Sequence, residues 1–152
     1  IDGSVARQGK INEKVLADLF DHPYFSVRPP KSLDRNEFDY SDVNNLSVQD
    51  AAATLVAFTT KAIVRSLEYF PEPPKRWLIT GGGRHNSFVM DELSRRLEAA
   101  VIPVEDVGWN GDALEAQAFA FLAVRSRLDL PLSFPATTGV PSELTGGDIY
   151  HR

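Results

Sequence analysis

The pattern of apolar and polar positions along the chain predicts four helices. In each of them, apolar side chains recur every three or four positions, which is the spacing of one helix face. The four segments are residues 12–20, 47–67, 86–97 and 113–127. Asn12, Ser47 and either Asn86 or Ser87 stand where N-cap residues are expected. The last segment is nearly all apolar, so we expect that helix to be buried.

Two short apolar runs, residues 77–80 and 101–104, predict β-strands. The continuous apolar character of the first run is typical of a buried strand. Since strands and helices alternate, the chain is predicted to be an α/β unit with parallel strands. Residues 24–45 are polar and rich in proline, aspartate and asparagine, so an extended connection with little regular structure is expected there. A similar composition predicts an irregular tail from Leu130 onward.

A sheet of two short strands is small for this much helix. We therefore expect the strands that open the sheet to precede Ile1, because the chain begins Ile-Asp-Gly rather than with a methionine. The 152 residues fit one domain.

Charge and composition narrow the classes of partner. The net charge of −5 indicates no basic face for nucleic acid. With no cysteine, the chain has neither disulfides nor a thiolate nucleophile. No apolar run is long enough for a bilayer, and no secretion signal is expected. These features predict a cytoplasmic protein that binds neither nucleic acid nor membrane.

Gly81, Gly82 and Gly83 lie between a predicted strand and a predicted helix. Glycines let backbone N–H groups approach a phosphate, and the following helix start favours an anion. The spacing matches neither a Walker A loop nor a dinucleotide motif. On this stretch alone, a structural turn and a nucleotide contact fit equally well. His85, which follows, is interpreted as an incidental exposed residue.

Asp112 and Glu115 stand at the start of the last predicted helix. Their spacing is that of a capping box, in which Asp112 caps the helix and Glu115 bonds back to it. The alternative places Glu115 in a polar cleft, where a carboxylate binds sugar hydroxyls or a metal–nucleotide complex. His22 and His151 have no partners at metal-ligand spacing, so no metal site made of protein ligands is expected.

Five segments of the chain, in the same order, resemble the C-terminal half of the anhydro-N-acetylmuramic acid kinase family. They are RQGKINEKVLADLFDHPYF, PPKSLDRNEF, LITGGGRHNSFVMDELSRRL, GWNGDALEAQAFAFLAVR and LPLSFPATTGVPSELTGG. The glycine segment and the NGDALEAQAFAFLA segment are the most specific. One departure is Ser-Leu-Asp-Arg at residues 32–35, where the family pattern has Ser-Thr-Gly-Arg.

The resemblance implies a fold and an activity. The family belongs to the sugar kinase, Hsp70 and actin superfamily, in which two ribonuclease-H-like lobes close over ATP and substrate. Its enzymes open the 1,6-anhydro ring of the sugar with water and phosphorylate O6 in the same reaction. The product, N-acetylmuramic acid 6-phosphate, belongs to peptidoglycan recycling. ATP with Mg²⁺ and a homodimer are implied as well.

The resemblance also implies an assignment for the chain. Residues 1–152 would be the C-terminal part of the second lobe, a helix-rich partial ribonuclease-H-like (actin-like ATPase) lobe, with the N-terminal lobe absent. Gly81, Gly82, Gly83 and Asn86 would contact the nucleotide, and Glu115 and Asp112 the sugar.

The family's catalytic aspartate lies in an Asp-Thr-Gly-Pro stretch expected upstream of Ile1, and Asp2 is not its equivalent. The chain alone is therefore expected to be inactive, and its open strand edges to make it associate.

Two other readings stay open. The chain could be a non-catalytic nucleotide-binding module of actin-like fold that has lost the chemistry. It could also belong to a related actin-like kinase for another sugar, because a glycine turn serves ATP in many such enzymes.

Overall fold

The computed structural model describes residues 2–148 and Tyr150 as a helix-rich α/β chain with a small parallel sheet. Its helices are α1 (Ser4–Gln8), α2 (Glu13–Phe20), α3 (Ser41–Asn44), α4 (Val48–Arg65), α5 (Ser87–Arg96), α6 (Leu114–Arg127) and α7 (Pro135–Thr138). Its strands are β1 (Arg76–Ile79) and β2 (Ala100–Pro103). Short 3-10 turns occupy Pro23–Ser26, Arg35–Glu37, Ser66–Tyr69, Gly82–His85 and Val104–Val107.

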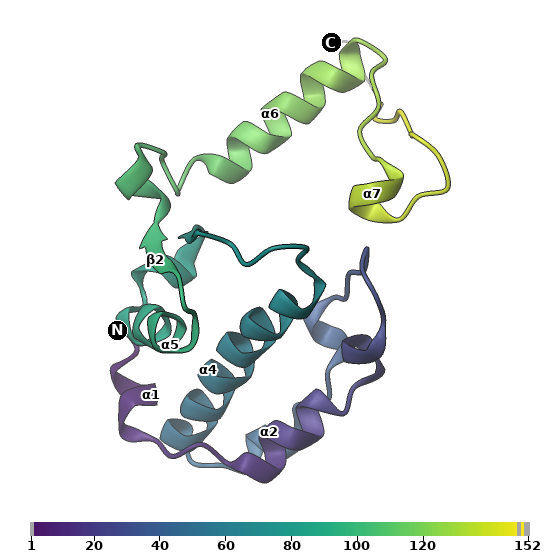
Figure 1. Ribbon diagram of the computed structural model, residues 1–152. Helices are drawn as coiled ribbons and strands as arrows, with labels where there is room; N and C mark the ends of the chain where they lie inside the picture. The colour runs from purple at the N-terminus through teal and green to yellow at the C-terminus, as the bar shows by residue number, and fades with distance from the viewer. Residues whose placement is uncertain (1, 149, 151–152) are drawn as a thin grey trace.

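Helix α4 is the central element, and α1, α2, α3 and α5 all contact it (Figure 1). The predicted cap is confirmed, because Ser47 Oγ accepts a hydrogen bond from the backbone N–H of Asp50 at 3.1 Å. The side chains that α4 buries are small or aromatic: Ala53, Thr54, Ala57, Phe58 and Thr60. The small ones let neighbouring helices approach the α4 backbone closely.

Helix α1 was not predicted from the sequence. Asp2, which precedes α1, binds the start of α5: its Oδ1 accepts a hydrogen bond from the backbone N–H of Ser87 at 2.8 Å. Arg7, also on this segment, pairs with Asp91 and donates to Ser87 Oγ. The N-terminal segment is thereby attached to the start of α5.

The main core lies between α2, α4 and the connection that follows α2. Its buried members are Val15, Leu16, Leu19, Phe25, Val43, Ala57 and Phe58. The expectation of an extended, irregular connection over residues 24–45 was wrong in part. The connection forms two 3-10 turns and α3, because Phe25 and Val43 are buried and fold it onto α4.

Strands β1 and β2 pair in parallel, with Trp77 opposite Val101 and Leu78 opposite Ile102. Helix α5 connects them, so the predicted strand–helix–strand unit is confirmed. The second strand begins one residue earlier than expected, at Ala100. The expectation that the first strand is buried was wrong, because β1 is only half-buried. A sheet of only two strands, as described, is too small to bury β1.

Helix α6 extends away from the α4 assembly (Figure 1). It forms where the sequence predicted a helix, but the expectation that it is buried was wrong, since none of its residues is buried. Phe119, Phe121 and Val124 are each more than half exposed. Within the described residues, no other element packs extensively along it. The same part of the chain contains no helix with the length and hydrophobicity that a bilayer crossing requires.

Candidate functional site

The three glycines form the turn that joins β1 to α5. Gly81 has a positive φ of 71°, and the chain then makes a 3-10 turn over Gly82–His85. Asn86 closes the turn and caps α5, because its Oδ1 accepts from the backbone N–H groups of Phe88 and Val89 at 3.1 and 3.2 Å. Of the two caps expected here, Asn86 or Ser87, the structure therefore has Asn86.

Packing does not account for the glycines of this turn. A Cβ atom added to Gly81, Gly82 or Gly83 would meet no atom of the described residues within 4 Å. Only Gly81 has the positive φ that favours glycine over other residues. Gly82 and Gly83 thus have neither a backbone nor a contact reason to lack a side chain. The turn presents bare backbone to open space, as close approach of a ligand requires.

Arg84 is buried beneath this turn, with a side chain that is 3% exposed. Each of its three side-chain nitrogens donates a hydrogen bond to a different group. Nη1 donates to Gly81 O at 2.9 Å, Nε to Glu105 Oε1 at 2.9 Å, and Nη2 to Asp112 Oδ1 at 2.6 Å. A buried charge is tolerated when it is paired in this way.

The turn before α6 is built by Asn110, not by Asp112. Asn110 Oδ1 accepts from the backbone N–H groups of Asp112 and Ala113 at 3.1 and 3.2 Å. The capping-box interpretation was wrong, because α6 has no side-chain cap and the Asp112 carboxylate bonds to Arg84 instead. Asp112 is exposed, and Glu115 is exposed in the first turn of α6. Since α6 is not buried, Glu115 does not have to be neutralised by the helix start.

Gly111 lies against the Arg84 ion pairs. Its N–H donates to Glu105 Oε1 at 3.2 Å. A Cβ atom at Gly111 would come within 2.6 Å of Arg84 Nε and 2.8 Å of Glu105 Oε1. Glycine is required at this position because the guanidinium group occupies the space that a side chain would take.

The charges of this network reinforce one another. The hydrogen bond from Arg84 holds the pKa of the Asp112 carboxyl below its usual range. The pKa of Glu105 is lowered as well, first by its own backbone N–H and then by Arg84 and Gly111. In turn, the bond to Asp112 raises the pKa of Arg84. Both carboxylates are therefore ionised at neutral pH.

His85 is closer to this network than expected. Its Nε2 lies 3.8 Å from Asp112 Oδ1, although its side chain is 66% exposed. The interpretation of His85 as incidental missed this contact, because Asp112 lies far along the sequence. His22 caps the first 3-10 turn, with Nδ1 accepting from the N–H of Tyr24 at 3.2 Å. His151 lies outside the described residues.

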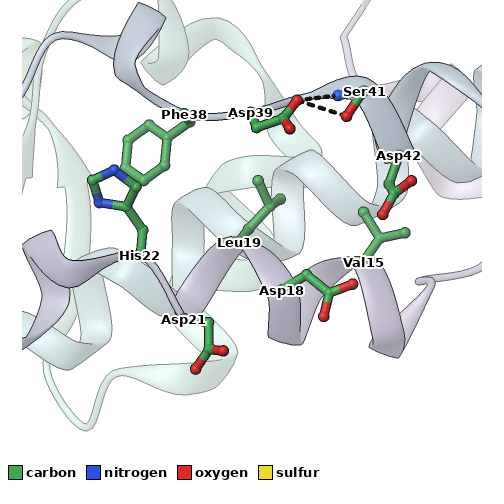
Figure 2. Close-up of a pocket in the computed structure, with 9 residues that line it drawn as sticks. All are labelled: Val15, Asp18, Leu19, Asp21, His22, Phe38, Asp39, Ser41 and Asp42. Atoms are coloured by element: carbon green, nitrogen blue, oxygen red, sulfur yellow. Dashed lines mark hydrogen bonds between the residues drawn. The ribbon is translucent and has the colours of Figure 1, made fainter.

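A separate acidic hollow lies between α2 and α3 (Figure 2). Four carboxylates line it together with His22: Asp18, Asp21, Asp39 and Asp42. Asp39 turns back to the start of α3, where it accepts hydrogen bonds from the N–H and hydroxyl of Ser41. Among the residues that the structure describes, no His, Asp and Glu side chains gather in a group able to hold a metal ion. The hollow is interpreted as solvated acidic surface.

Sequence reasoning missed Arg84 as a site residue. Two signals were available in the sequence. An arginine directly follows three glycines, and the acidic residues Glu105 and Asp112 stand on either side of the turn before α6. Spacing could not pair them, because the carboxylates lie 21 and 28 positions from the arginine. Parallel pairing of β1 and β2 is what brings the two turns together.

Comparison with known proteins identifies the family of the chain. The family model described as anhydro-N-acetylmuramic acid kinase matches residues 1–152. The chain belongs to the anhydro-N-acetylmuramic acid kinase family. A relative of that name from Rhodospirillum rubrum is 57% identical over 149 residues, which is 98% of this chain and 40% of the relative.

Two further relatives carry the same name. The protein of Paramagnetospirillum magneticum is 53% identical over 97% of this chain and 42% of its own length. That of Caulobacter vibrioides is 49% identical over 97% of this chain and 40% of its own length. The chain thus spans about 40% of the length of the curated relatives that it matches. The resemblance to the anhydro-N-acetylmuramic acid kinase family is confirmed at the level of the family.

Proposed function

We propose that this chain is part of an ATP-dependent kinase of 1,6-anhydro-N-acetylmuramic acid. In the proposed reaction, water opens the anhydro ring and O6 of the sugar receives the γ-phosphoryl group of ATP. The products are N-acetylmuramic acid 6-phosphate and ADP. The proposal is supported by the name of the Rhodospirillum rubrum relative, which is 57% identical over nearly the whole chain.

The turn at residues 81–83 forms the nucleotide side of the proposed site. The observation that carries this assignment is the open space beside all three glycines, which packing leaves unexplained. Backbone N–H groups at such a turn can approach a phosphate or ribose without a side chain in between. Asn86 contributes through its side-chain amide nitrogen, because its oxygen is engaged as the cap of α5.

Asp112 and Glu115 form the sugar side. Asp112 uses Oδ1 for Arg84, and the 78% exposure of its side chain leaves the carboxylate accessible to a ligand. Glu115 is exposed one helical turn further on. Carboxylates accept hydrogen bonds from sugar hydroxyls. The two residues would orient the sugar by accepting hydrogen bonds from its hydroxyls.

In this proposal, the residues of this chain bind and orient ATP and the sugar. The attack of water on the sugar also needs a general base. That base is proposed to be an aspartate outside these 152 residues, in the other part of a two-lobed, ribonuclease-H-like kinase. Mg²⁺ would arrive with ATP, since this ion binds largely through phosphate oxygens and few carboxylates. Phosphoryl transfer depends on positioning and charge neutralisation, so both lobes are required. A cytoplasmic homodimer is part of the same proposal.

A chimera tests the proposed function. The chain replaces the matching 149 residues of the Rhodospirillum rubrum relative, and ADP release from ATP is measured with 1,6-anhydro-N-acetylmuramic acid. The same graft made with the Paramagnetospirillum magneticum segment controls for the junctions. We expect both chimeras to release ADP only when the sugar is present, and the 152-residue chain alone to release none.

Other outcomes distinguish the alternatives. If the control graft is active and the chimera binds ATP without turnover, the chain is a nucleotide-binding module that lacks the chemistry. Turnover with a different sugar, and none with the anhydro sugar, would indicate a related kinase. ADP release by the 152-residue chain alone would contradict the assignment of the base to another part of the enzyme.

A further inference from the structure

Arg84 connects two turns that belong to different halves of the proposed site. Its Nη1 bonds to the carbonyl of Gly81, at the nucleotide turn. Its Nε and Nη2 bond to Glu105 and Asp112, on either side of the turn before α6. The side chain is 3% exposed, so it is held in place and does not face the ligand space directly.

We propose that Arg84 is a positioning residue that fixes the glycine turn relative to the turn carrying Asp112 and Glu115, and so couples the nucleotide side of the site to the sugar side. This inference rests on the proposed function for its catalytic consequence. Its structural content, a guanidinium group joining two turns, is independent of that function.

Arginine suits this task better than lysine. A planar guanidinium group donates in several fixed directions, whereas an ammonium group is a point charge on a flexible stem. Here all three nitrogens are used, each toward a different residue: Gly81, Glu105 and Asp112. Gly111 completes the fit, since a Cβ atom there would come within 2.6 Å of Arg84 Nε. The missing side chain of Gly111 thus leaves room for the Arg84 guanidinium group between the glycine turn and the turn before α6.

The consequence for the reaction follows from geometry. Transfer of a phosphoryl group requires donor and acceptor to be held at reacting distance, and misplacement by about 1 Å costs on the order of 100-fold in rate. Loss of Arg84 would leave each turn intact but free to shift against the other. Both substrates would then be bound less well and placed less well, although Arg84 touches neither.

The test uses two variants, Arg84→Lys and Arg84→Met, in the active chimera. The control is Arg95→Gln, which removes another arginine–carboxylate pair: Arg95 is 63% exposed on α5, and the buried Glu92 keeps its second partner, Arg96. Steady-state kinetics are measured for both substrates, with the folded fraction checked by circular dichroism. We expect Arg84→Met to lower kcat/KM by about 10- to 100-fold, with KM raised for ATP and for the sugar together. Arg84→Lys should fall between Arg84→Met and the parent, and Arg95→Gln should match the parent.

The KM values for ATP and for the sugar distinguish a positioning role of Arg84 from a role in folding stability alone. If Arg84 only kept the chain folded, its variants would reduce the amount of active enzyme and leave both KM values at the parent level. That result would overturn the inference. So would an additive double-mutant cycle between Arg84→Met and Asp112→Asn, because the two residues are proposed to act as one unit.

Hydrogen exchange provides a readout that needs no activity. In the 152-residue chain, the Gly111 N–H donates to Glu105 Oε1, and we expect Arg84→Met to speed its exchange while Arg95→Gln leaves it unchanged. Unchanged exchange in Arg84→Met would overturn the structural content of the inference. A chimera without activity would overturn the proposed function instead, and the exchange experiment would still decide whether Arg84 joins the turns.

Discussion

Thr54 Oγ1 accepts a hydrogen bond from the backbone N–H of Asn12 at 3.0 Å and thereby joins the start of α2 to α4. The same hydroxyl donates to Asp50 O at 2.7 Å, so the fully buried Thr54 is satisfied on both sides. Thr54→Val keeps the shape but leaves the Asn12 N–H without its partner. We expect the free energy of unfolding to fall by about 1–2 kcal/mol, measured by urea denaturation. Thr59→Val, on the exposed face of the same helix, is the control, and an equal loss there would contradict the prediction.

Gly9 lies against the backbone at the start of α4. A Cβ atom at Gly9 would lie 1.9 Å from the backbone oxygen of Gln49 and 2.8 Å from the nitrogen of Asp50. Gly9→Ala therefore forces two backbones apart, and we expect it to destabilise the chain by about 2–3 kcal/mol in thermal or urea unfolding. Gly146→Ala has room, with only Leu132 at 3.8 Å. Equal stability of the two variants would show that α1 does not pack as described.

The glycines of the proposed site should separate into two kinds. In the part of the chain that the structure describes, the new Cβ of Gly82→Ala or Gly83→Ala meets no atom within 4 Å, so we expect unchanged melting temperatures together with weaker ATP binding in the chimera. Gly111→Ala meets Arg84 at 2.6 Å and should lower the melting temperature. Calorimetry for unfolding and for ATP binding measures both effects. Unchanged ATP affinity in Gly82→Ala and Gly83→Ala would argue for a purely structural turn.

The Arg84–Asp112 pair predicts a dependence of stability on pH. Because the hydrogen bond from Arg84 lowers the pKa of Asp112 in the folded chain, folding favours the ionised carboxylate. That contribution is complete above the ordinary aspartate pKa of about 3.9 and is lost as the pH falls through the lower folded value. Melting temperatures from pH 7 to pH 2.5 should show a smaller acid-induced loss in Asp112→Asn than in the parent. Parallel curves for the two proteins would contradict this.

The exposed apolar residues of α6 predict self-association of the 152-residue chain. Phe119 and Phe121 are 65% and 61% exposed, and an apolar helix surface of this kind drives association. Light scattering should show oligomers, and Phe119→Lys combined with Phe121→Lys should shift them toward monomers. Val27→Lys, a 50% exposed apolar residue elsewhere on the chain, is the control and should leave the oligomers in place. A monodisperse monomer of the parent chain would contradict the prediction.

Local signals in the sequence predicted the elements well. Asn12, Ser47 and Asn86 each cap the helix that they were expected to cap, because a cap depends only on residues a few positions away. The two strands and the helix between them were predicted for the same reason, from short apolar runs and helical spacing. The irregular tail also followed from its composition, although it contains the short helix α7.

Burial was predicted poorly. An apolar segment indicates that a surface will be covered, but the cover itself comes from other elements, and within the described residues no other helix or strand packs extensively along α6. The connection after α2 shows the opposite error: it was expected to be extended because it is polar, but Phe25 and Val43 are buried and pack it against the core. Composition averages over a segment, whereas one or two apolar side chains decide where it packs.

The sequence by itself determined where the four longer helices and the two strands form, that three glycines follow the first strand, and that the chain resembles one kinase family. Only the tertiary structure decided what those residues touch. It assigned Asp112 to Arg84 rather than to a helix cap, and it left Gly82 and Gly83 beside open space. The physical reason is separation along the chain: Arg84 and Asp112 are 28 positions apart, and only the parallel pairing of β1 with β2 brings their turns within hydrogen-bond distance.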